Sequence, residues 1–295
     1  MNFNFEPDRF RDSVLELIRK ASCELPVDVV QAMEKGRDSE AEGSAAKSVL
    51  SYMLKNARAA QENSTPICQD TGTNIYFITI PEGVSLRKVE QGIVDATRIA
   101  TEKSYLRPNA VDSVTGRNSG DNTGIMAPYY HFEEWDEPVI KVEIVLKGGG
   151  CENVSDQYKL PNNRLKADRD IDGVYKCIID AINNAQGLGC APGVVGIGIG
   201  GDRASGMIIA KKQLFRKLPD VNPDRELQDL EERLFKDLNT LGIGPMGFGG
   251  GTTVLGVKVG SAHRLPASFF VSISYMCWAD RRKTLLYSEG EVDYD

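Results

Sequence analysis

The spacing of apolar residues changes from a helical repeat to strand patterns near residue 75, and this change limits the fold more than any other feature. The first quarter of the chain predicts helices, the longest over residues 39–62. The run Ile75–Ile80 then predicts a strand, which Pro81 ends.

Beyond that strand, helix and strand patterns are mixed without a regular β–α–β alternation. Helices are predicted over residues 86–103, 171–182 and 224–239, and strands over 139–146, 194–199, 253–259 and 269–276. Such a mixture favours an α+β fold rather than a doubly wound sheet. We expect one domain over residues 1–295, with a helical N-terminal part followed by mixed strands and helices, and two lobes that divide near Trp135–Pro138.

Charge and hydropathy exclude several classes of partner. The formal net charge of −7 argues against a nucleic-acid ligand, which requires a basic face. It does not exclude an anionic substrate, because a few placed arginines create a local positive field. The sequence contains no apolar run of bilayer-spanning length and no signal-peptide pattern at its start. We therefore expect a cytoplasmic protein without a membrane or nucleic-acid partner.

Six cysteines in a cytoplasmic chain of this size do not predict a disulfide framework. Three of them lie where regular structure is predicted to stop: Cys68 and Cys190 between a helix and a strand, and Cys277 at the end of a strand. Loops at such ends are where a scaffold presents ligands. Cys23 and Cys177 fall within helical patterns and are predicted core residues.

Three thiolates far apart in the sequence suit a [4Fe–4S] cluster better than a zinc site, because the chain has no CxxC pair. Three protein ligands would leave one iron open as a Lewis acid. From spacing alone, three unrelated buried thiols remain the commoner interpretation.

Five stretches, in order within residues 62–282, resemble the iron–sulfur hydro-lyases of the class I fumarase and tartrate dehydratase family. They are Pro66–Gly72, Leu106–Val111, Lys147–Gly150, Gly196–Gly201 and His263–Pro266. The resemblance implies that Cys68, Cys190 and Cys277 bind a [4Fe–4S] cluster. It also implies an α subunit, because single-chain members continue into a β domain that completes the active site. A separate β subunit, in an α2β2 assembly, would supply the remaining cations and bases.

Family resemblance and residue chemistry together suggest roles in the hydration of a dicarboxylate. Arg107, in a turn fixed by proline, is predicted to bind a substrate carboxylate through two hydrogen bonds. Gln69 and Asp70 adjoin a cluster ligand; Gln69 would bind substrate and Asp70 would act in proton transfer. The alternative for Asp70 is a cap on the following turn.

Two further positions complete the predicted site. His263 is assigned to substrate binding and catalysis, since the family uses a histidine at this motif. Gly149 and Gly150 would let main-chain N–H groups approach a carboxylate as a small anion nest. The run Gly196–Gly201 also fits a dinucleotide-binding fingerprint, although close packing of the backbone is the better interpretation because no early β–α–β unit surrounds it.

The substrate and the role of Cys151 stay open. The favoured reaction is reversible addition of water to fumarate, giving malate, and Asp121–Thr123 and Glu152–Asn153 support it. Dehydration of L-tartrate to oxaloacetate is the alternative, supported by Cys151 after three glycines and by Cys277–Ala279. Mesaconate is a third candidate substrate. Cys151 is a candidate for the substrate pocket and leaves open which three thiols bind iron. The other classes are an electron carrier with a three-cysteine cluster and a metal-free scaffold subunit.

Overall fold

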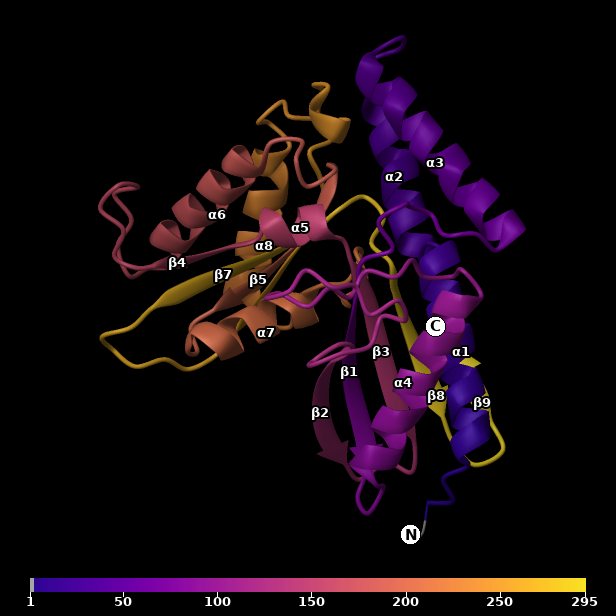
Figure 1. Cartoon of the computed structure of the whole chain (residues 1–295). Helices are drawn as coiled ribbons and strands as arrows, with labels where there is room; N and C mark the ends of the chain where they lie inside the picture. Colours follow the sequence, from indigo (N-terminus) through magenta and orange to yellow (C-terminus); the bar gives the residue numbers. More distant parts are fainter. Residues whose placement is uncertain (1–2) are drawn as a thin grey trace. The chain divides into compact units, whose positions relative to one another are not determined.

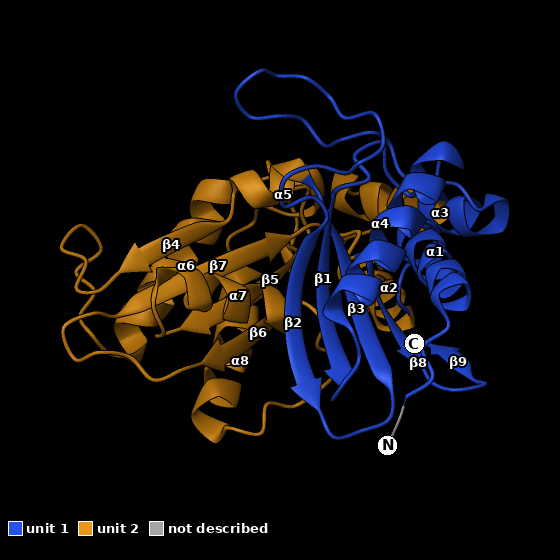
Figure 2. Ribbon diagram, turned by 60° about the horizontal axis from the view of Figure 1, so that its bottom comes forward, with its two compact units in different colours: residues 1–26, 56–148, 281–295 blue, residues 27–55, 149–280 orange. Residues whose placement is uncertain are grey.

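The computed structural model describes residues 3–295 and divides into two compact units, which are described separately. Unit 1 comprises residues 1–26, 56–148 and 281–295, and unit 2 comprises residues 27–55 and 149–280 (Figure 2). Each unit therefore combines segments that are distant in the sequence. The segment Trp135–Pro138 connects two strands inside unit 1.

Unit 1 is built on a mixed sheet with the strand order β2-β1-β3-β8-β9. Its strands are β1 (Thr73–Pro81), β2 (Tyr129–Trp135), β3 (Ile140–Lys147), β8 (Arg282–Tyr287) and β9 (Val292–Tyr294). β1 and β2 are parallel, and the other neighbouring pairs are antiparallel.

Two amphipathic helices, α1 (Pro7–Cys23) and α4 (Leu86–Glu102), pack against each other and supply the apolar core of unit 1 (Figure 1). The stripe predicted from Phe10, Val14 and Ile18 is fully buried, together with Val89 and Ile93 of α4. The helical repeat thus places these side chains in the core beside β1, β3 and β8.

Unit 2 contains the second sheet, with the strand order β4-β7-β5-β6. Its strands are β4 (Asp156–Lys159), β5 (Gly193–Ile199), β6 (Val254–Ser261) and β7 (Phe270–Met276). β5 lies parallel to β6 and antiparallel to β7, so the start of β5 and the end of β7 meet at one end of the sheet.

The helices of unit 2 surround this sheet. They are α2 (Val27–Ser39), α5 (Gly149–Asn153), α6 (Ile171–Ala185), α7 (Arg203–Gln213) and α8 (Arg225–Leu238), with the short turn η1 (Pro245–Gly247). A Cβ on Gly196 would lie 2.2 Å from the carbonyl oxygen of Ala210, and one on Gly198 would lie 2.2 Å from that of Gly206. The prediction that this glycine run serves close packing is confirmed, since α7 approaches β5 where a side chain would not fit.

The α+β class is confirmed, while several element bounds differ from those predicted. The helix expected from residue 39 begins later, as α3 (Ala45–Asn63), and the boundary between the units falls within it. Glu40 lies in the preceding turn, where its carboxylate accepts hydrogen bonds from the Thr252 N–H (2.7 Å) and hydroxyl (2.6 Å). Strands β2, β4, β8 and β9 and helices α5 and α7 were not predicted. Within residues 3–295, none of the helices has the length and apolar character to cross a bilayer.

Candidate functional site

One end of the unit 1 sheet gathers three segments that carry candidate residues. β1 begins at Thr73, opposite Lys147 at the end of β3, and β8 begins at Arg282, opposite Val145. The loop Cys68–Gly72 immediately precedes β1, and Arg281 immediately precedes β8. Because neighbouring strand ends lie side by side, this loop and Arg281 share one end of the sheet.

Ile67, the residue before Cys68, is held by hydrogen bonds at both its main-chain N–H and its carbonyl. The Ile67 N–H donates to the carbonyl of Ser22 (3.0 Å), and the Asn56 side-chain amide donates to the Ile67 carbonyl (2.8 Å). Ile67 is buried whereas Cys68 is exposed. The loop therefore presents the Cys68 thiol on the surface of unit 1 from a fixed point of attachment.

The structure shows Asp70 in the capping arrangement that was the alternative to an acid–base role. Its Oδ1 accepts the Gly72 N–H at 2.9 Å. The main-chain carbonyl of Asp70 accepts a hydrogen bond from Arg281 Nη1 at 2.7 Å. The two roles are compatible, because a carboxylate has two oxygens and about four lone pairs.

Arg107 lies next to the same loop in unit 1. Its Nη1 donates to the Gln69 carbonyl (3.2 Å), and its main-chain N–H donates to the Thr71 hydroxyl (3.1 Å). Asn109 also donates to that hydroxyl, at 2.9 Å. The fold thus brings Cys68, Gln69, Asp70 and Arg107 together, although Arg107 is far from them in the sequence.

Cys190 and Cys277 are brought together at one end of the unit 2 sheet. Met276, the last residue of β7, lies opposite Val194 of β5. Just beyond this pair, the Trp278 N–H donates to the carbonyl of Cys190 at 3.2 Å. Cys190 has a φ of +57°, a conformation uncommon for residues other than glycine. The two thiols therefore project from adjacent loops held by one main-chain hydrogen bond.

Tyr275 lies under the Cys190 loop. A Cβ on Gly189 would lie 2.5 Å from the ring of Tyr275, and one on Gly193 would lie 2.3 Å from it, so only glycine fits at these positions. Burial raises the pKa of the Tyr275 phenol, and electrostatic interactions with nearby Cys277, Cys151 and Cys190 raise it further. The phenol thus stays neutral beside these three sulfur atoms.

Cys151, the third thiol near Tyr275, is buried in α5. Its Sγ lies 3.8 Å from the carbonyl oxygen of Gly189 and donates a weak hydrogen bond to it. Gly149 and Gly150 form the first turn of α5, beside the same loop, with the position of a Gly150 Cβ 3.3 Å from the Leu188 carbonyl oxygen. Unit 2 therefore places Gly149, Gly150 and Cys151 near Cys190.

Cys23 and Cys177 are fully buried, as predicted. Burial raises the pKa of each thiol to about 11. Both side chains are packed as small apolar groups, and their thiols are poor ligands because they remain protonated near neutral pH.

His263 lies at the other end of the unit 2 sheet. It follows β6, whose last residue Ser261 lies opposite Ile199 at the end of β5, whereas Cys190 precedes the start of β5. The seven residues of β5 span about 20 Å at the usual rise of a strand. The His263 carbonyl accepts the Gly201 N–H (3.3 Å), which keeps the loop at that end. One copy of unit 2 therefore does not bring His263 to Cys190 and Cys277.

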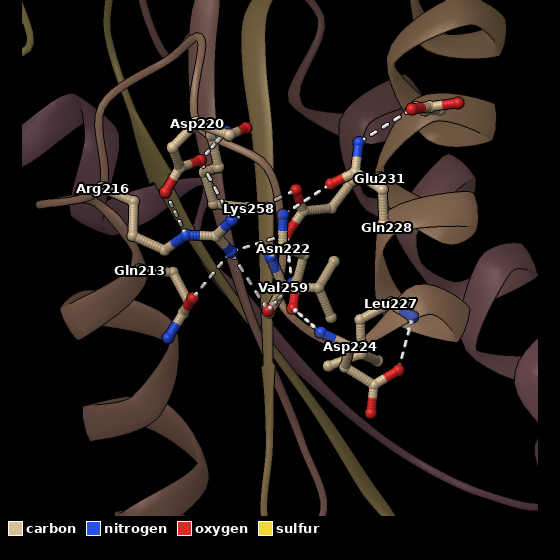
Figure 3. Close-up of polar contacts among 11 residues, drawn as sticks. Gln213, Arg216, Asp220, Asn222, Asp224, Leu227, Gln228, Glu231, Lys258 and Val259 are labelled. Atoms are coloured by element: carbon tan, nitrogen blue, oxygen red, sulfur yellow. Dashed lines mark hydrogen bonds and ion pairs between the residues drawn. The ribbon is translucent and has the colours of Figure 1, made fainter.

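A buried polar network fixes the strand that leads to His263 (Figure 3). Glu231 Oε1 accepts the Val259 N–H at 2.8 Å, and Asn222 donates to the Val259 carbonyl at 2.9 Å. Arg216 donates to Glu231 at 2.7 Å, and Lys258 pairs with Asp220. Glu231 and Asn222 therefore supply hydrogen bonds to main-chain groups on the outer edge of β6. β6 is the last strand of the sheet, so no neighbouring strand can supply them.

A profile of the fumarate hydratase (Fumerase) family matches residues 11–285, nearly the whole chain. The chain belongs to the fumarate hydratase family. A putative class I fumarate hydratase of Geobacillus stearothermophilus is 48% identical over 97% of this chain, but this chain covers only 59% of that relative.

Two other relatives are matched by this chain over almost their whole length. The putative L(+)-tartrate dehydratase subunit alpha of Methanocaldococcus jannaschii is 38% identical, over 93% of this chain and 96% of the relative. The L(+)-tartrate dehydratase subunit alpha of Escherichia coli K12 is 32% identical, over 95% and 91% respectively. The chain thus matches more than nine tenths of each alpha subunit, and about three fifths of the Geobacillus protein.

Cysteine thiols are the candidate metal donors of this chain. Within the described part of the chain, no group of three or more His, Cys, Asp or Glu side chains converges closely enough for one metal ion. Two thiols on adjacent loops of unit 2, and an exposed thiol on a fixed loop of unit 1, are donors of the kind that iron–sulfur clusters use. In addition, the buried Nε of Arg281, next to the Cys68 loop, has no hydrogen-bond acceptor among the described residues.

Sequence reasoning did not identify Tyr275 and did not assign Arg281 to the Cys68 loop. Tyr275 could have been found, because it lies two residues before Cys277 and alternate residues of a strand share a face. The glycines at 189 and 193 were the second signal, since they leave room for a ring. Nothing local identifies Arg281, whose burial depends on strand pairing between distant segments.

Proposed function

We propose that this chain is the α subunit of a [4Fe–4S]-dependent hydro-lyase that reversibly adds water to fumarate to give malate. The observation that carries the proposal is the placing of Cys190 and Cys277 on adjacent loops above Tyr275. Membership of the fumarate hydratase family and the identity to the Geobacillus protein support it. A separate β subunit, in an α2β2 complex, completes the active site, in keeping with the two alpha-subunit relatives.

Cys68, Cys190 and Cys277 would hold the cluster. When bound, a cluster with three protein ligands supplies an open iron that acts as a Lewis acid toward substrate oxygens. The exposed position of Cys68 in unit 1 suits a ligand that meets donors from another part of the chain. Cys151 is the alternative third ligand, because it lies beside Cys190 within unit 2.

The residues around Cys68 would bind and orient the dicarboxylate. The exposed Arg107 donates one side-chain hydrogen bond to the Gln69 carbonyl, and its guanidinium has five N–H donors in all. They suit a carboxylate, which matches the fork of a guanidinium. The amide of Gln69 and the main-chain N–H groups of Gly149 and Gly150 would hold the remaining carboxylate oxygens.

Asp70 would transfer the proton at carbon. In hydration its protonated carboxyl would give a proton to one alkene carbon, the neighbouring carbon would gain the hydroxyl of a water molecule, and the proton that this water releases would go to a base from the β subunit. In dehydration the Asp70 carboxylate would remove the proton from carbon. The Gly72 N–H bonds one carboxylate oxygen and fixes its orientation.

We keep His263 as a proposed substrate-binding and acid–base residue, but it would act in the site of a second copy of the chain. About 20 Å of β5 separates its loop from Cys190, more than a histidine side chain can bridge. An α2β2 complex provides that second copy, so each site would combine Asp70 from one α chain with His263 from the other.

Dehydration of L-tartrate to oxaloacetate is the second candidate function. The specific observation that favours it is length, because the two tartrate dehydratase alpha subunits match this chain over more than nine tenths of their own sequences. The Geobacillus protein is more similar in sequence but extends well beyond the match.

The test supplies the missing part in trans. The part of the Geobacillus relative that this chain does not match is added to the anaerobically reconstituted chain, and consumption of fumarate and of L-tartrate is measured. We expect little turnover by the chain alone, and fumarate hydration at least about 10²-fold faster with the added part, because the site then gains its missing acid–base groups. Robust hydration by the isolated chain, or turnover of neither substrate by the pair, would contradict the proposal. Turnover of tartrate in preference to fumarate selects the second candidate.

A further inference from the structure

We propose that Arg281 is the positioning residue that fixes the loop carrying Cys68 and Asp70, through its hydrogen bond to the main chain of that loop. The inference rests on the proposed function only in taking Cys68 as a cluster ligand and Asp70 as the proton-transfer residue. The contact itself lies entirely within unit 1.

Arg281 is a buried cation that bonds directly to the loop. Its side chain is among the largest fully buried ones, with 1% of the residue exposed. A guanidinium stays charged at any physiological pH and is costly to bury without hydrogen bonds. Its Nη1 donates to the Asp70 carbonyl at 2.7 Å, at the short end of the usual range, as expected for a charged donor. This carbonyl lies two residues from Cys68.

The main chain that carries Arg281 is itself fixed by the sheet. The carbonyl of Arg281 accepts the Leu146 N–H at 3.0 Å, and the next residue, Arg282, lies opposite Val145 in the β3–β8 pair. The guanidinium therefore reaches the loop from a rigid strand end, and it can act as a fixed reference for the loop.

The far end of the loop is fixed by contact with the same strand. A Cβ on Gly72 would lie 2.8 Å from the main-chain carbonyl carbons of Leu146 and Lys147, so this residue packs directly on the end of β3. Ile67 fixes the near end through its bonds to Ser22 and Asn56. Arg281 holds the middle of the loop, where Gln69 and Asp70 would otherwise rely on exposed contacts.

Arg107 and Arg281 divide two tasks. They donate to consecutive carbonyls, those of Gln69 and Asp70, but Arg107 is exposed whereas Arg281 is buried. Because Arg281 holds the loop through the Asp70 carbonyl, Arg107 can give up its 3.2 Å hydrogen bond to the Gln69 carbonyl and bind a substrate carboxylate. The loop that carries Cys68 then stays in place. Arg281 is almost completely buried and is therefore assigned to positioning and not to substrate binding.

The experiment measures amide hydrogen exchange in the cluster-free protein, so that it does not depend on cluster binding. In Arg281→Lys, which keeps the charge but loses the planar fork, we expect residues 69–72 to exchange at least about tenfold faster, with β5 and β7 unchanged. Arg169→Lys is the control, since Arg169 also bonds main-chain carbonyls, those of Leu160 and Ala267, but in unit 2. It should leave residues 69–72 unchanged.

A second variant keeps the test decisive if Arg281→Lys does not fold. Arg107→Ala removes only an exposed contact, and it should change exchange at residues 69–72 by less than about twofold because Arg281 still holds the loop. A tenfold increase in Arg107→Ala, or unchanged exchange in folded Arg281→Lys, overturns the inference.

In the assembled enzyme, steady-state kinetics distinguish a positioning role of Arg281 from a role in substrate binding. Arg281→Lys should lower kcat by about 10- to 100-fold, since small displacements of reacting groups have effects of this size, while KM changes little. Loss of general stability alone would leave kcat per folded molecule unchanged and would contradict the inference. If the wild-type protein binds no cluster, the proposed function fails, whereas the exchange measurements still decide the role of Arg281.

Discussion

The main-chain N–H of Trp278 donates a hydrogen bond to the carbonyl of Cys190, 3.2 Å away. This bond joins the loop that precedes β5 to the loop that follows β7, just beyond the paired residues Val194 and Met276. The two proposed ligands of unit 2 are therefore held as neighbours by the sheet itself. The third proposed ligand, Cys68, belongs to unit 1.

Gly193→Ala should disturb this arrangement. The added methyl group would lie 2.3 Å from the ring of Tyr275, which is buried and cannot easily move. Overpacking of this kind costs about 1–3 kcal/mol. We expect a lower midpoint of chemical denaturation together with lower iron content after anaerobic reconstitution.

Gly124→Ala is the matched control for that variant. No atom lies within 4 Å of the position that its Cβ would take. Its effect should stay within about 0.5 kcal/mol, with normal iron content. Equal midpoints for the two variants would show that Tyr275 does not restrict the Cys190 loop.

Arg107→Ala and Asp70→Asn should impair the enzyme in different ways. Arg107 is proposed to bind a carboxylate in both the ground and the transition state, and loss of a charged contact costs about 1.5–3 kcal/mol. KM should therefore rise about 10- to 100-fold, with the cluster retained.

Asp70→Asn keeps the oxygen that accepts the Gly72 N–H and removes the titrating group. Proton transfer contributes about 10²–10⁴-fold, so kcat should fall by that factor while KM changes little. Steady-state kinetics of the enzyme assembled with its β part check both variants. A near-normal kcat in Asp70→Asn, with the cluster intact, would leave Asp70 as a turn cap alone.

His263 and Asp70 should complement each other between copies of the chain. Each variant alone, His263→Asn or Asp70→Asn, should be nearly inactive. Co-assembly of the two should restore up to about a quarter to a half of wild-type activity, because mixed α2 pairs contain one site with both native residues. Activity no greater than the sum of the two variants would show that His263 does not serve a second copy.

Asp220 should make part of the free energy of unfolding of unit 2 dependent on pH. Burial alone would raise the pKa of its carboxyl, but hydrogen bonds and charge from Arg216 and Lys258 outweigh burial and lower it below the ordinary 3.8 (Figure 3). A lowered pKa in the folded state stabilises the protein above 3.8, and this stabilisation is lost as the pH falls through the folded value.

Asp220→Asn should therefore be less stable than the wild type at about pH 7, and the difference should shrink as the pH falls below 3.8. Denaturation followed at several pH values measures it. Asp229→Asn, which changes an exposed carboxylate on α8, is the control and should show no such trend. A difference that is constant with pH would contradict the assignment.

The local patterns of the sequence predicted much of the fold, because they reflect burial within one element. The strand at Ile75–Ile80 and the helix stripe from Phe10 to Ile18 are examples. β8 was not predicted, since Arg282–Tyr287 becomes a strand by pairing with β3, more than a hundred residues away. Such distant pairing also explains why each unit is built from segments that are separated in the sequence.

The candidate site shows the same division. Loop positions marked Cys190 and Cys277 as candidate ligands, since both lie at strand ends, but their proximity depends on the pairing of β5 with β7. The position of His263 at the opposite end of the sheet depends on β6 running parallel to β5, which the motif His263–Pro266 does not reveal. Nothing in the local sequence identifies Arg281, and only the packed structure shows it to be buried on the Cys68 loop.

The most direct test of the account is the cluster content of six single Cys→Ser variants after anaerobic reconstitution. Iron and sulfide analysis, with electron paramagnetic resonance of the oxidised form, should show one [4Fe–4S] cluster per chain in the wild type and in the Cys23 and Cys177 variants. Cys68→Ser, Cys190→Ser and Cys277→Ser should lose it, and Cys151→Ser should keep it. Retention of the cluster in Cys190→Ser would contradict the central claim, and loss in Cys151→Ser with retention in Cys68→Ser would place the site wholly within unit 2.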